Sequence, residues 1–242
     1  MKEKYIVVFD SGVGGLTVLR SCVQRCPQER FAYFGDNGNA PYGNRSTEEI
    51  CFLALRALNR IARMHVRAAI LACNTVTAAC VDNLRSRFDF PVFGIEPAVK
   101  PASALGGKVL LLATRATLSC RRVQRLIRVN SSGAEIFPFS PVDLAGEIEK
   151  NVFNLSRVRL ERHLPQGNYD SVVLGCTHYV FLKKRIEEFY GCPVFDGGAG
   201  TADHVAKVLN VCSQNTAFLP EKQPVFWGKF KKYNRNAYNT LA

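Results

Sequence analysis

The chain has 242 residues, of which 47% are hydrophobic and 21% are charged. This length and composition suffice for one large domain or two smaller ones with their own hydrophobic cores, and they exclude an intrinsically disordered chain. Lys and Arg number 32 against 20 Asp and Glu, giving a net charge of +12, so an anionic ligand or a nucleic acid is an admissible partner.

The N-terminal segment has no signal for export. Its apolar run before Asp10 is shorter than the core of a signal peptide, and no later run approaches the length of a membrane span. We therefore expect a cytoplasmic protein with no membrane partner.

Short apolar runs alternate along the chain with stretches that have the period of amphipathic helices. This alternation predicts an α/β fold, in which parallel strands are joined by crossover helices. The predicted strands are Tyr5–Phe9, Phe31–Phe34, Ala68–Ala72, Val92–Ile95, Val109–Ala113, Glu135–Phe139, Ser171–Leu174 and Val194–Phe195. The predicted helices are Leu16–Arg25, Thr47–Met64, Thr77–Phe88, Thr117–Arg128, Val142–Lys150, Leu182–Tyr190 and Ala202–Leu209. Ser46 supplies an N-cap, with Glu48 and Glu49 in the first helical turn.

Eight strands are many for one sheet, and the segment Glu96–Pro101 interrupts the alternation near the middle of the chain. We interpret this segment as a hinge. A weak internal repeat supports two lobes, because Cys73 and Cys176 each follow a buried strand and precede a polar segment with threonine. The sequence thus predicts two similar lobes, each a mainly parallel sheet flanked by helices, with the active site in the cleft between them.

Cys73 and Cys176 are the candidate catalytic residues, because ligands of open α/β sheets bind at the carboxyl ends of strands. A helix N-terminus beside a cysteine predicts a thiol pKa below about 8.5. One cysteine in such a place is more often inert, but two in matching contexts favour catalysis. The odd total of nine cysteines without a CxxC pair indicates neither a disulfide framework nor a zinc ribbon, and we expect the other seven to be ordinary thiols.

Two thiols that face one pocket from two lobes suit stereoinversion at a carbon, in which one base removes a proton and an acid on the opposite face returns one. Asn74 and Thr75 follow the first thiol and Thr177 the second, while His178 is placed to partner Cys176. Acyl transfer and thiol–disulfide exchange are the alternative chemistries, and neither accounts for the duplication.

A glycine-rich turn, Asp10–Gly15, lies between the first predicted strand and helix. It has Thr17 where a dinucleotide-binding fingerprint needs Gly or Ala, and the chain has no P-loop sequence. The turn either binds an anion such as a carboxylate through its backbone amides or is required only by packing, and Asp10 and Ser11 favour the first interpretation. The loop Phe34–Gly43 is a candidate lid or substrate wall.

Two segments concentrate the basic residues. No acid occurs between Glu96 and Glu135, and the tail after Pro220 interleaves Lys and Arg with aromatic residues. We interpret both as solvated helix faces beside a docked C-terminus, whereas the alternative is a binding protein that holds nucleic acid on this basic surface. The three histidines other than His178 have no metal-ligand spacing, so we predict no metal site.

Six motifs in this order resemble the glutamate racemase family, over residues 5 to about 210. They are Asp-Ser-Gly-x-Gly-Gly at 10–15, Tyr33–Asp36 with Pro41–Gly43, Ala72–Thr75, Gly94–Pro97 with Lys100–Pro101, Ala113–Thr117 and Gly175–Tyr179. The two cysteine motifs alone also fit the wider aspartate/glutamate racemase superfamily.

The resemblance implies a cofactor-independent racemase that interconverts L- and D-glutamate and supplies D-glutamate for bacterial peptidoglycan. A racemase of another acidic amino acid, such as aspartate, is the alternative. It also implies that Cys73 and Cys176 are the two bases, assisted by Asp10 and His178. The implied substrate contacts are Asp10, Ser11, Tyr42, Gly43, Asn74, Thr75, Thr177 and His178, with Thr114 and Thr117 helping to bind a carboxylate.

The chain departs from the family pattern at three places: Val180 replaces a usual proline, Val76 and Thr77 replace Ala-Ser, and the tail lacks a usual Ser-Gly. Glu149 matches a further family glutamate too loosely to count as a site residue. We expect a first lobe of residues 1–97 plus 203–242, a second lobe of residues 98–202, and a homodimer.

Overall fold

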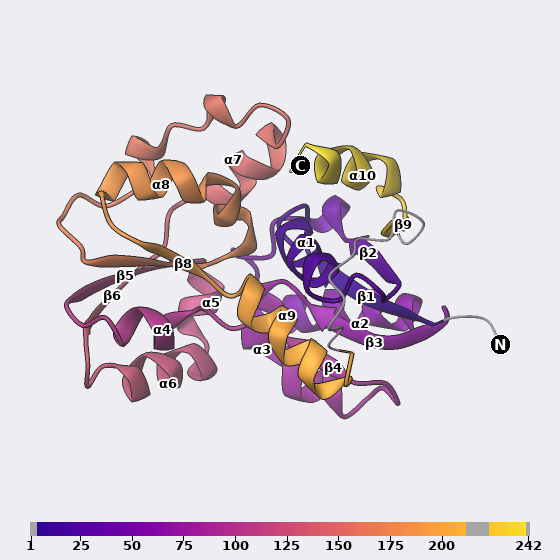
Figure 1. The fold of residues 1–242 in the computed structure, drawn as a ribbon. Helices are drawn as coiled ribbons and strands as arrows, with labels where there is room; N and C mark the ends of the chain where they lie inside the picture. The colour runs from indigo at the N-terminus through magenta and orange to yellow at the C-terminus, as the bar shows by residue number, and fades with distance from the viewer. Residues whose placement is uncertain (1–3, 212–222, 241–242) are drawn as a thin grey trace.

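The protein contains two parallel β-sheets that lie side by side (Figure 1). The computed structural model describes residues 4–211 and 223–240. The first sheet has the strand order β4-β3-β1-β2-β9 and the second has the order β6-β5-β7-β8. The strands are β1 (Tyr5–Asp10), β2 (Phe31–Gly35), β3 (Val66–Leu71), β4 (Val92–Gly94), β5 (Lys108–Ala113), β6 (Glu135–Phe139), β7 (Ser171–Gly175), β8 (Val194–Asp196) and β9 (Val225–Trp227). The predicted α/β fold with two mainly parallel sheets is confirmed.

Helices cover both faces of the first sheet, because strand side chains alternate between the faces. Ile6 and Val8 of β1 belong to one core with α1 (Leu16–Arg25), α9 (Gly198–Val208) and α10 (Lys231–Asn239). Val7 and Phe9 belong to the other core with α2 (Thr47–Ile61) and α3 (Asn74–Arg85). Burial on both faces explains why these strands have continuous apolar sequences.

The second sheet is covered in the same way. Leu110 and Leu112 of β5 pack with α7 (Leu144–Asn151) and α8 (Lys183–Tyr190). Val109 and Leu111 pack with α4 (Val99–Ser103) and α6 (Arg121–Asn130), on the opposite face (Figure 1). The shorter elements are α5 (Arg115–Ser119) and the 3-10 helices η1 (Asn37–Asn39), η2 (Leu155–Arg157), η3 (Leu160–Arg162) and η4 (Thr177–Leu182).

Local sequence signals account for several helix ends. Helix α1 has the predicted bounds, and α2 begins with the predicted cap. The Ser46 hydroxyl accepts a hydrogen bond from the Glu49 amide at 3.2 Å, and the Glu49 carboxylate accepts one from the Ser46 amide at 3.1 Å. This capping box satisfies two backbone donors at once.

Other predicted elements were wrong in their bounds. The helix predicted over 117–128 is two helices, because Cys120 is extended, with φ −72° and ψ 135°, between α5 and α6. Helix α3 begins at Asn74 rather than Thr77. Helix α4 begins at Val99 inside the predicted hinge, since a proline in the first turn, here Pro101, removes no helical hydrogen bond. The sequence did not predict β9 or α10.

The C-terminal segment joins the first sheet. Strand β9 pairs with β2, where Tyr33 lies opposite Phe226 and their ring centroids are 6.2 Å apart. The eight cysteines within the described residues are free thiols, and Cys212 lies outside those residues. Over residues 4–211 and 223–240, no helix is both long and apolar enough to cross a membrane.

Candidate active site

The two candidate cysteines follow central strands of different sheets. Cys73 lies between β3 and α3, where it is the N-cap residue of the helix. Cys176 lies between β7 and η4. Both side chains are buried. Ser11 Oγ lies 3.5 Å from the Cys73 sulfur, and its neighbour Asp10 accepts a hydrogen bond at 3.1 Å from Thr177, the residue after Cys176. The two lobes therefore bring the thiols together in one buried site.

The glycine turn after β1 packs directly on the second lobe. A Cβ at Gly14 would lie 2.7 Å from Nδ1 of His178, and a Cβ at Gly12 would overlap the Glu149 carboxylate. The Val13 amide donates to Glu149 Oε2 at 2.9 Å. The turn thus binds a carboxylate of the protein itself, and only glycine fits at its two contact positions.

On the first-lobe side, the Cys73 thiol contacts a hydroxyl and lies near a carboxyl group. Its Sγ is 3.5 Å from Ser11 Oγ. Burial, followed by repulsion from Asp10, raises the pKa of Cys73 to about 12, although the hydrogen bond with Ser11 opposes the rise. For Cys73, the pKa below about 8.5 expected from the helix dipole was wrong, because desolvation of its buried thiolate outweighs the dipole.

On the second-lobe side, Cys176 contacts a histidine that is itself paired. His178 Nδ1 is 3.9 Å from the Cys176 Sγ, and His178 Nε2 is 2.6 Å from Glu149 Oε2. Burial lowers the pKa of His178, but its contacts with Cys176 and Glu149 outweigh burial and raise the pKa well above its usual value. His178 is therefore held as an imidazolium beside the sulfur.

Glu149 is the anionic partner of that imidazolium. Burial raises its pKa, whereas His178, the Val13 amide and Asn37 together lower it below the usual value. Asn37 Nδ2 donates to Glu149 Oε1 at 2.7 Å. A buried carboxylate with three donors stays ionised, since hydrogen bonds to the charged form stabilise it.

Asp10, at the end of β1, contacts residues of both lobes. Its Oδ1 accepts from the Gly12 amide at 2.9 Å, and its Oδ2 accepts from Thr177 Oγ1 at 3.1 Å. Burial raises the pKa of Asp10, while the positive charge of His178 lowers it to a smaller extent. The first lobe thus supplies a carboxyl group that touches the residue next to Cys176.

Polar side chains of the predicted substrate site are buried beside Cys73. The Thr75 hydroxyl is 3.0 Å from the Thr114 hydroxyl and 3.1 Å from the Thr117 hydroxyl, and the last two are 2.9 Å apart. Asn74 is buried, and its Oδ1 has no partner among the described residues. The three hydroxyls thus bond one another, and the Asn74 oxygen is the atom of this cluster that the described fold leaves without a partner.

Tyr42 and Gly43 lie in the loop after η1. The Tyr42 hydroxyl donates to Asp36 Oδ2 at 2.6 Å and the side chain is buried. A Cβ at Gly43 would lie 2.7 Å from Thr114, and the Gly43 carbonyl accepts from the Ala116 amide at 3.1 Å. The loop therefore forms a wall between the lobes and is fixed to both.

Sequence analysis left three contacts out of the site. Glu149 was set aside as a loose match, yet it holds His178. Asn37 was included only as part of a loop, and Tyr233 only as an aromatic residue of the tail. Tyr233 donates from its hydroxyl to the Glu149 carbonyl at 2.8 Å. The loose match of Glu149 to a family glutamate was the one available signal, and the other two contacts depend on tertiary structure.

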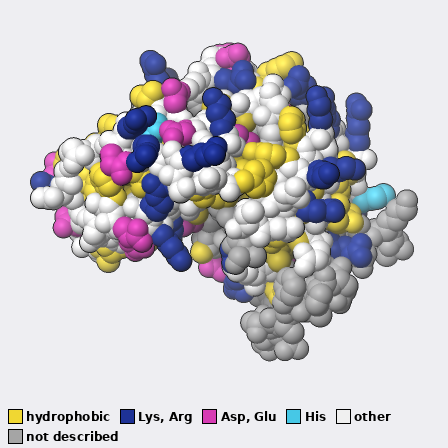
Figure 2. Space-filling view, turned by 90° about the horizontal axis from the view of Figure 1, so that it is seen from above, with side chains coloured by type: hydrophobic (Ala, Val, Ile, Leu, Met, Phe, Trp, Pro, Cys, Tyr) yellow, Lys and Arg dark blue, Asp and Glu magenta, His cyan; other side chains and the backbone are white. Residues whose placement is uncertain are grey.

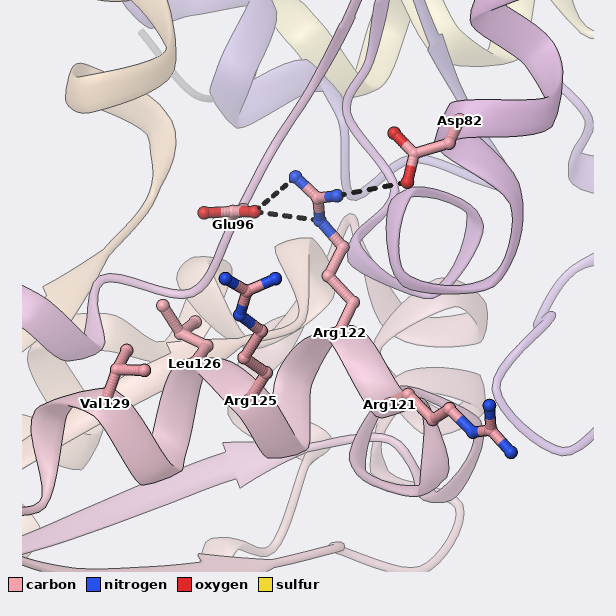
Figure 3. A pocket seen from close by; sticks show the side chains of 7 residues that line it. All are labelled: Asp82, Glu96, Arg121, Arg122, Arg125, Leu126 and Val129. Carbon is pink, nitrogen blue, oxygen red and sulfur yellow. Dashed lines mark hydrogen bonds and ion pairs between the residues drawn. The ribbon is translucent and has the colours of Figure 1, made fainter.

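The larger hollows of the described surface lie away from the cysteines. One of about 480 Å³ is lined by both acidic and basic residues (Figure 3): Asp82, Glu96, Arg121, Arg122, Arg125, Leu126 and Val129. Arg122 there pairs with Glu96 at 2.6 Å and with Asp82 at 3.4 Å. The acid-free segment therefore meets acids of the first lobe in space.

On the face that Figure 2 shows, Lys and Arg side chains are scattered among apolar and uncharged ones, and the acidic side chains lie mostly toward its left side. Within residues 4–211 and 223–240, no group of three or more His, Cys, Asp or Glu side chains is arranged to hold a metal ion.

Comparison with known proteins adds an independent finding. A family model described as Asp/Glu/hydantoin racemase matches residues 6–205. The chain belongs to this racemase family.

Curated relatives within the racemase family are glutamate racemases. One from Clostridium botulinum (strain Okra / Type B1) is 34% identical over 97% of this chain and 92% of its own length. One from Leptospira borgpetersenii is 39% identical over 85% of this chain and 82% of its own length.

Solved racemase structures share the fold. Glutamate racemase isoform RacE1 from Bacillus anthracis superposes with a TM-score of 0.80 at 25% identity, covering 100% of this chain and 95% of that one. The Escherichia coli glutamate racemase, solved with L-glutamate and the activator UDP-MurNAc-Ala, gives a TM-score of 0.80 at 27% identity, covering 99% and 94%.

Proposed function

We propose that this racemase interconverts L- and D-glutamate with Cys73 and Cys176 as its two bases, without a cofactor. The single observation that carries the proposal is the pair of buried thiols brought to one site from two lobes. Relatives of similar length that are glutamate racemases support the choice of substrate.

The reaction consists of two proton transfers. One cysteine, as a thiolate, takes the proton from the substrate Cα and becomes a thiol, while the electron pair of the C–H bond stays on the carbon. The other cysteine, as a thiol, gives its proton to the opposite face and becomes a thiolate. The product is the mirror image of the substrate, and reversing the two protonation states reverses the direction.

Removal of a Cα proton is difficult, so the site must stabilise negative charge that develops on the carbon and its carboxylate. The buried hydroxyls of Ser11, Thr75 and Thr177 and the side-chain amide of Asn74 are the proposed donors. Because these side chains are buried, each of these hydrogen bonds is stronger than it would be in solvent.

Asp10 and His178 are the proposed assistants of the two thiols. Asp10 is a buried carboxyl group on the Cys73 side, where it can exchange a proton with an ammonium group or a thiol. His178 is an imidazolium on the Cys176 side and stabilises the negative charge that this sulfur acquires when it gives up its proton.

Several further points belong to the same proposal. The first lobe consists of residues 1–97 plus 203–242, the second consists of residues 98–202, and substrate binds between them. The enzyme acts in the cytoplasm as a homodimer and supplies D-glutamate for peptidoglycan. Light scattering of the purified chain across a concentration series measures its oligomeric state.

The experiment that tests the function is incubation with L-glutamate in deuterium oxide. We expect optical rotation to decay to zero while solvent deuterium enters Cα, measured by polarimetry and proton NMR. L-Aspartate in the same assay checks the substrate. Retained rotation with no deuterium at Cα of glutamate contradicts the proposal, and faster turnover of aspartate changes its substrate.

A further inference from the structure

The C-terminal helix α10 contacts the histidine side of the site through a chain of hydrogen bonds. Asn234 Nδ2 donates to Asn37 Oδ1 at 2.9 Å, and Asn37 Nδ2 donates to Glu149 Oε1 at 2.7 Å. Glu149 Oε2 is 2.6 Å from His178 Nε2, whose other ring nitrogen faces Cys176. The chain links helix α10 of the first lobe to the second-lobe thiol.

The negative charge of Glu149 determines which group donates in each hydrogen bond between Asn234, Asn37 and Glu149. The ionised Glu149 can only accept hydrogen bonds, so Asn37 must present its NH2 group to it. The Asn37 carbonyl oxygen then faces Asn234, which must donate in turn. If Asn234 did not donate, the Asn37 oxygen would lose its partner, and the amide would be less firmly held in the position from which it donates to Glu149.

The packing around Asn234 is built to hold it in place. The residue is fully buried, and its Oδ1 has no partner among the described residues. A Cβ at Gly35 would lie 2.7 Å from both Asn234 Nδ2 and Asn37 Oδ1, so only glycine fits at this end of β2. An apolar residue of the same shape would avoid the cost of the unpaired oxygen, which indicates that the amide is kept for its donor.

A second contact of the same helix reaches the same glutamate. The Tyr233 hydroxyl donates to the Glu149 carbonyl at 2.8 Å. Helix α10 thereby holds both the backbone and, through Asn37, the side chain of Glu149. Neither Tyr233 nor Asn234 is among the residues assigned above to substrate binding or proton transfer.

We propose that Asn234 is a positioning residue for the proton transfers of Cys176, acting through Asn37 and Glu149 on His178. This inference rests on the proposed two-cysteine reaction. It assigns a function to the C-terminal segment that contains α10, which differs from the family pattern. That function concerns the thiol of Cys176 and not that of Cys73.

The test uses the full-length chain with Asn234→Leu, which keeps the side-chain size but removes both the donor and the unpaired oxygen. We expect kcat to fall about tenfold with KM nearly unchanged, because no residue of α10 is assigned to substrate binding. The melting temperature should change little, since removal of the unpaired Asn234 oxygen offsets the donor that Asn37 loses. Asn236→Ala, an exposed asparagine of the same helix, is the matched control and keeps full activity.

The substrate isotope effect tells positioning apart from a general loss of activity. The two enantiomers have equal free energy, so kcat/KM falls equally in both directions. With glutamate deuterated at Cα, the isotope effect should grow in the direction in which Cys176 removes the deuteron and shrink in the other, because only the Cys176 transfers have slowed.

Tyr233→Phe is the second variant, with Tyr238→Phe as its control on the same helix. We expect a loss of about threefold for the first and none for the second. A double variant with Glu149→Gln tests the route, since Asn234→Leu should then have no additional effect.

Each outcome decides a separate claim. Wild-type protein that fails to racemise glutamate contradicts the proposed function. Active wild type together with an unchanged kcat for Asn234→Leu, an equal change of the isotope effect in both directions, or full additivity with Glu149→Gln overturns the positioning role alone.

Discussion

The two cysteines occupy equivalent places in their lobes but differ in their charged neighbours. Cys73 has an acidic neighbour, Asp10, and a pKa raised to about 12. Cys176 has a cationic neighbour, His178, which Glu149 holds in its protonated form. The repeated strand end thus supplies the positions of the thiols, whereas their charged neighbours differ, as suits a reaction that uses one thiol and one thiolate.

The largest expected effect comes from replacing either of the two thiols. Cys73→Ser and Cys176→Ser should each lower racemisation of glutamate by at least about a thousandfold, because a serine hydroxyl is a far weaker acid than a thiol and cannot serve as the base near neutral pH. Polarimetry measures the loss. Cys120→Ser, a half-buried thiol bonded to the Ala116 carbonyl, is the control that keeps activity. Full activity in either site variant contradicts the two-base reaction.

The second effect concerns the ion pair that only the Cys176 side has. Glu149→Gln should lower the free energy of unfolding at pH 7 by about 3 kcal/mol, because it leaves a buried imidazolium without its anion. Glu147→Gln, on the same helix beside the partly exposed His163, should cost less than about 1 kcal/mol. Urea unfolding of the three proteins measures both, and equal losses would show that Glu149 is an ordinary surface acid.

The pH dependence of that stability has a definite sign. The folded-state pKa of Glu149 is lowered from 4.5, so its stabilisation is present above that value and is lost as pH falls through the folded pKa. The pKa of His178 is raised from 6.5, so its stabilisation is present below that value and is lost as pH rises through the folded pKa. The difference between wild type and Glu149→Gln should therefore be largest between these limits.

The smallest expected effect concerns the Cys73 side. Ser11→Ala removes the hydrogen bond that lowers the pKa of Cys73, so that pKa should rise further. We expect kcat/KM at pH 8 to fall about fivefold and the alkaline limb of its pH profile to move upward. Ser21→Ala, in α1 with its hydroxyl bonded to the Thr17 carbonyl, should leave the profile unchanged. A profile that moves downward would mean that Ser11 destabilises the thiolate.

Local sequence signals predicted the parts of this molecule that depend on local physics. Apolar runs placed eight strands within two residues of their observed ends, and Ser46 marked the start of α2. The motifs around Cys73 and Cys176 placed both thiols at strand ends. These features depend on the periodicity of apolar side chains, on helix caps and on turn residues. All of these signals come from residues that are close together in the sequence.

Other features depend on contacts between distant segments. The short strand β9 exists because β2 offers it a partner, and three residues carry no period that could reveal it. The raised pKa of Cys73 depends on how completely the lobes exclude water. Asn37 and Asn234 carry no motif, and their role follows from a glutamate more than 80 residues from either one.

The pairing of β2 with β9 also determines when the fold can be completed. The chain builds the first four strands of one sheet, then the whole second sheet, and only then returns to place Val225 beside Ala32. A growing polypeptide therefore leaves the ribosome with an open edge on its first sheet and with Asn37 and Glu149 still lacking α10. Because contacts so distant in sequence form slowly, the pairing of β2 with β9 is the step of this fold that needs the longest stretch of chain to be in place first.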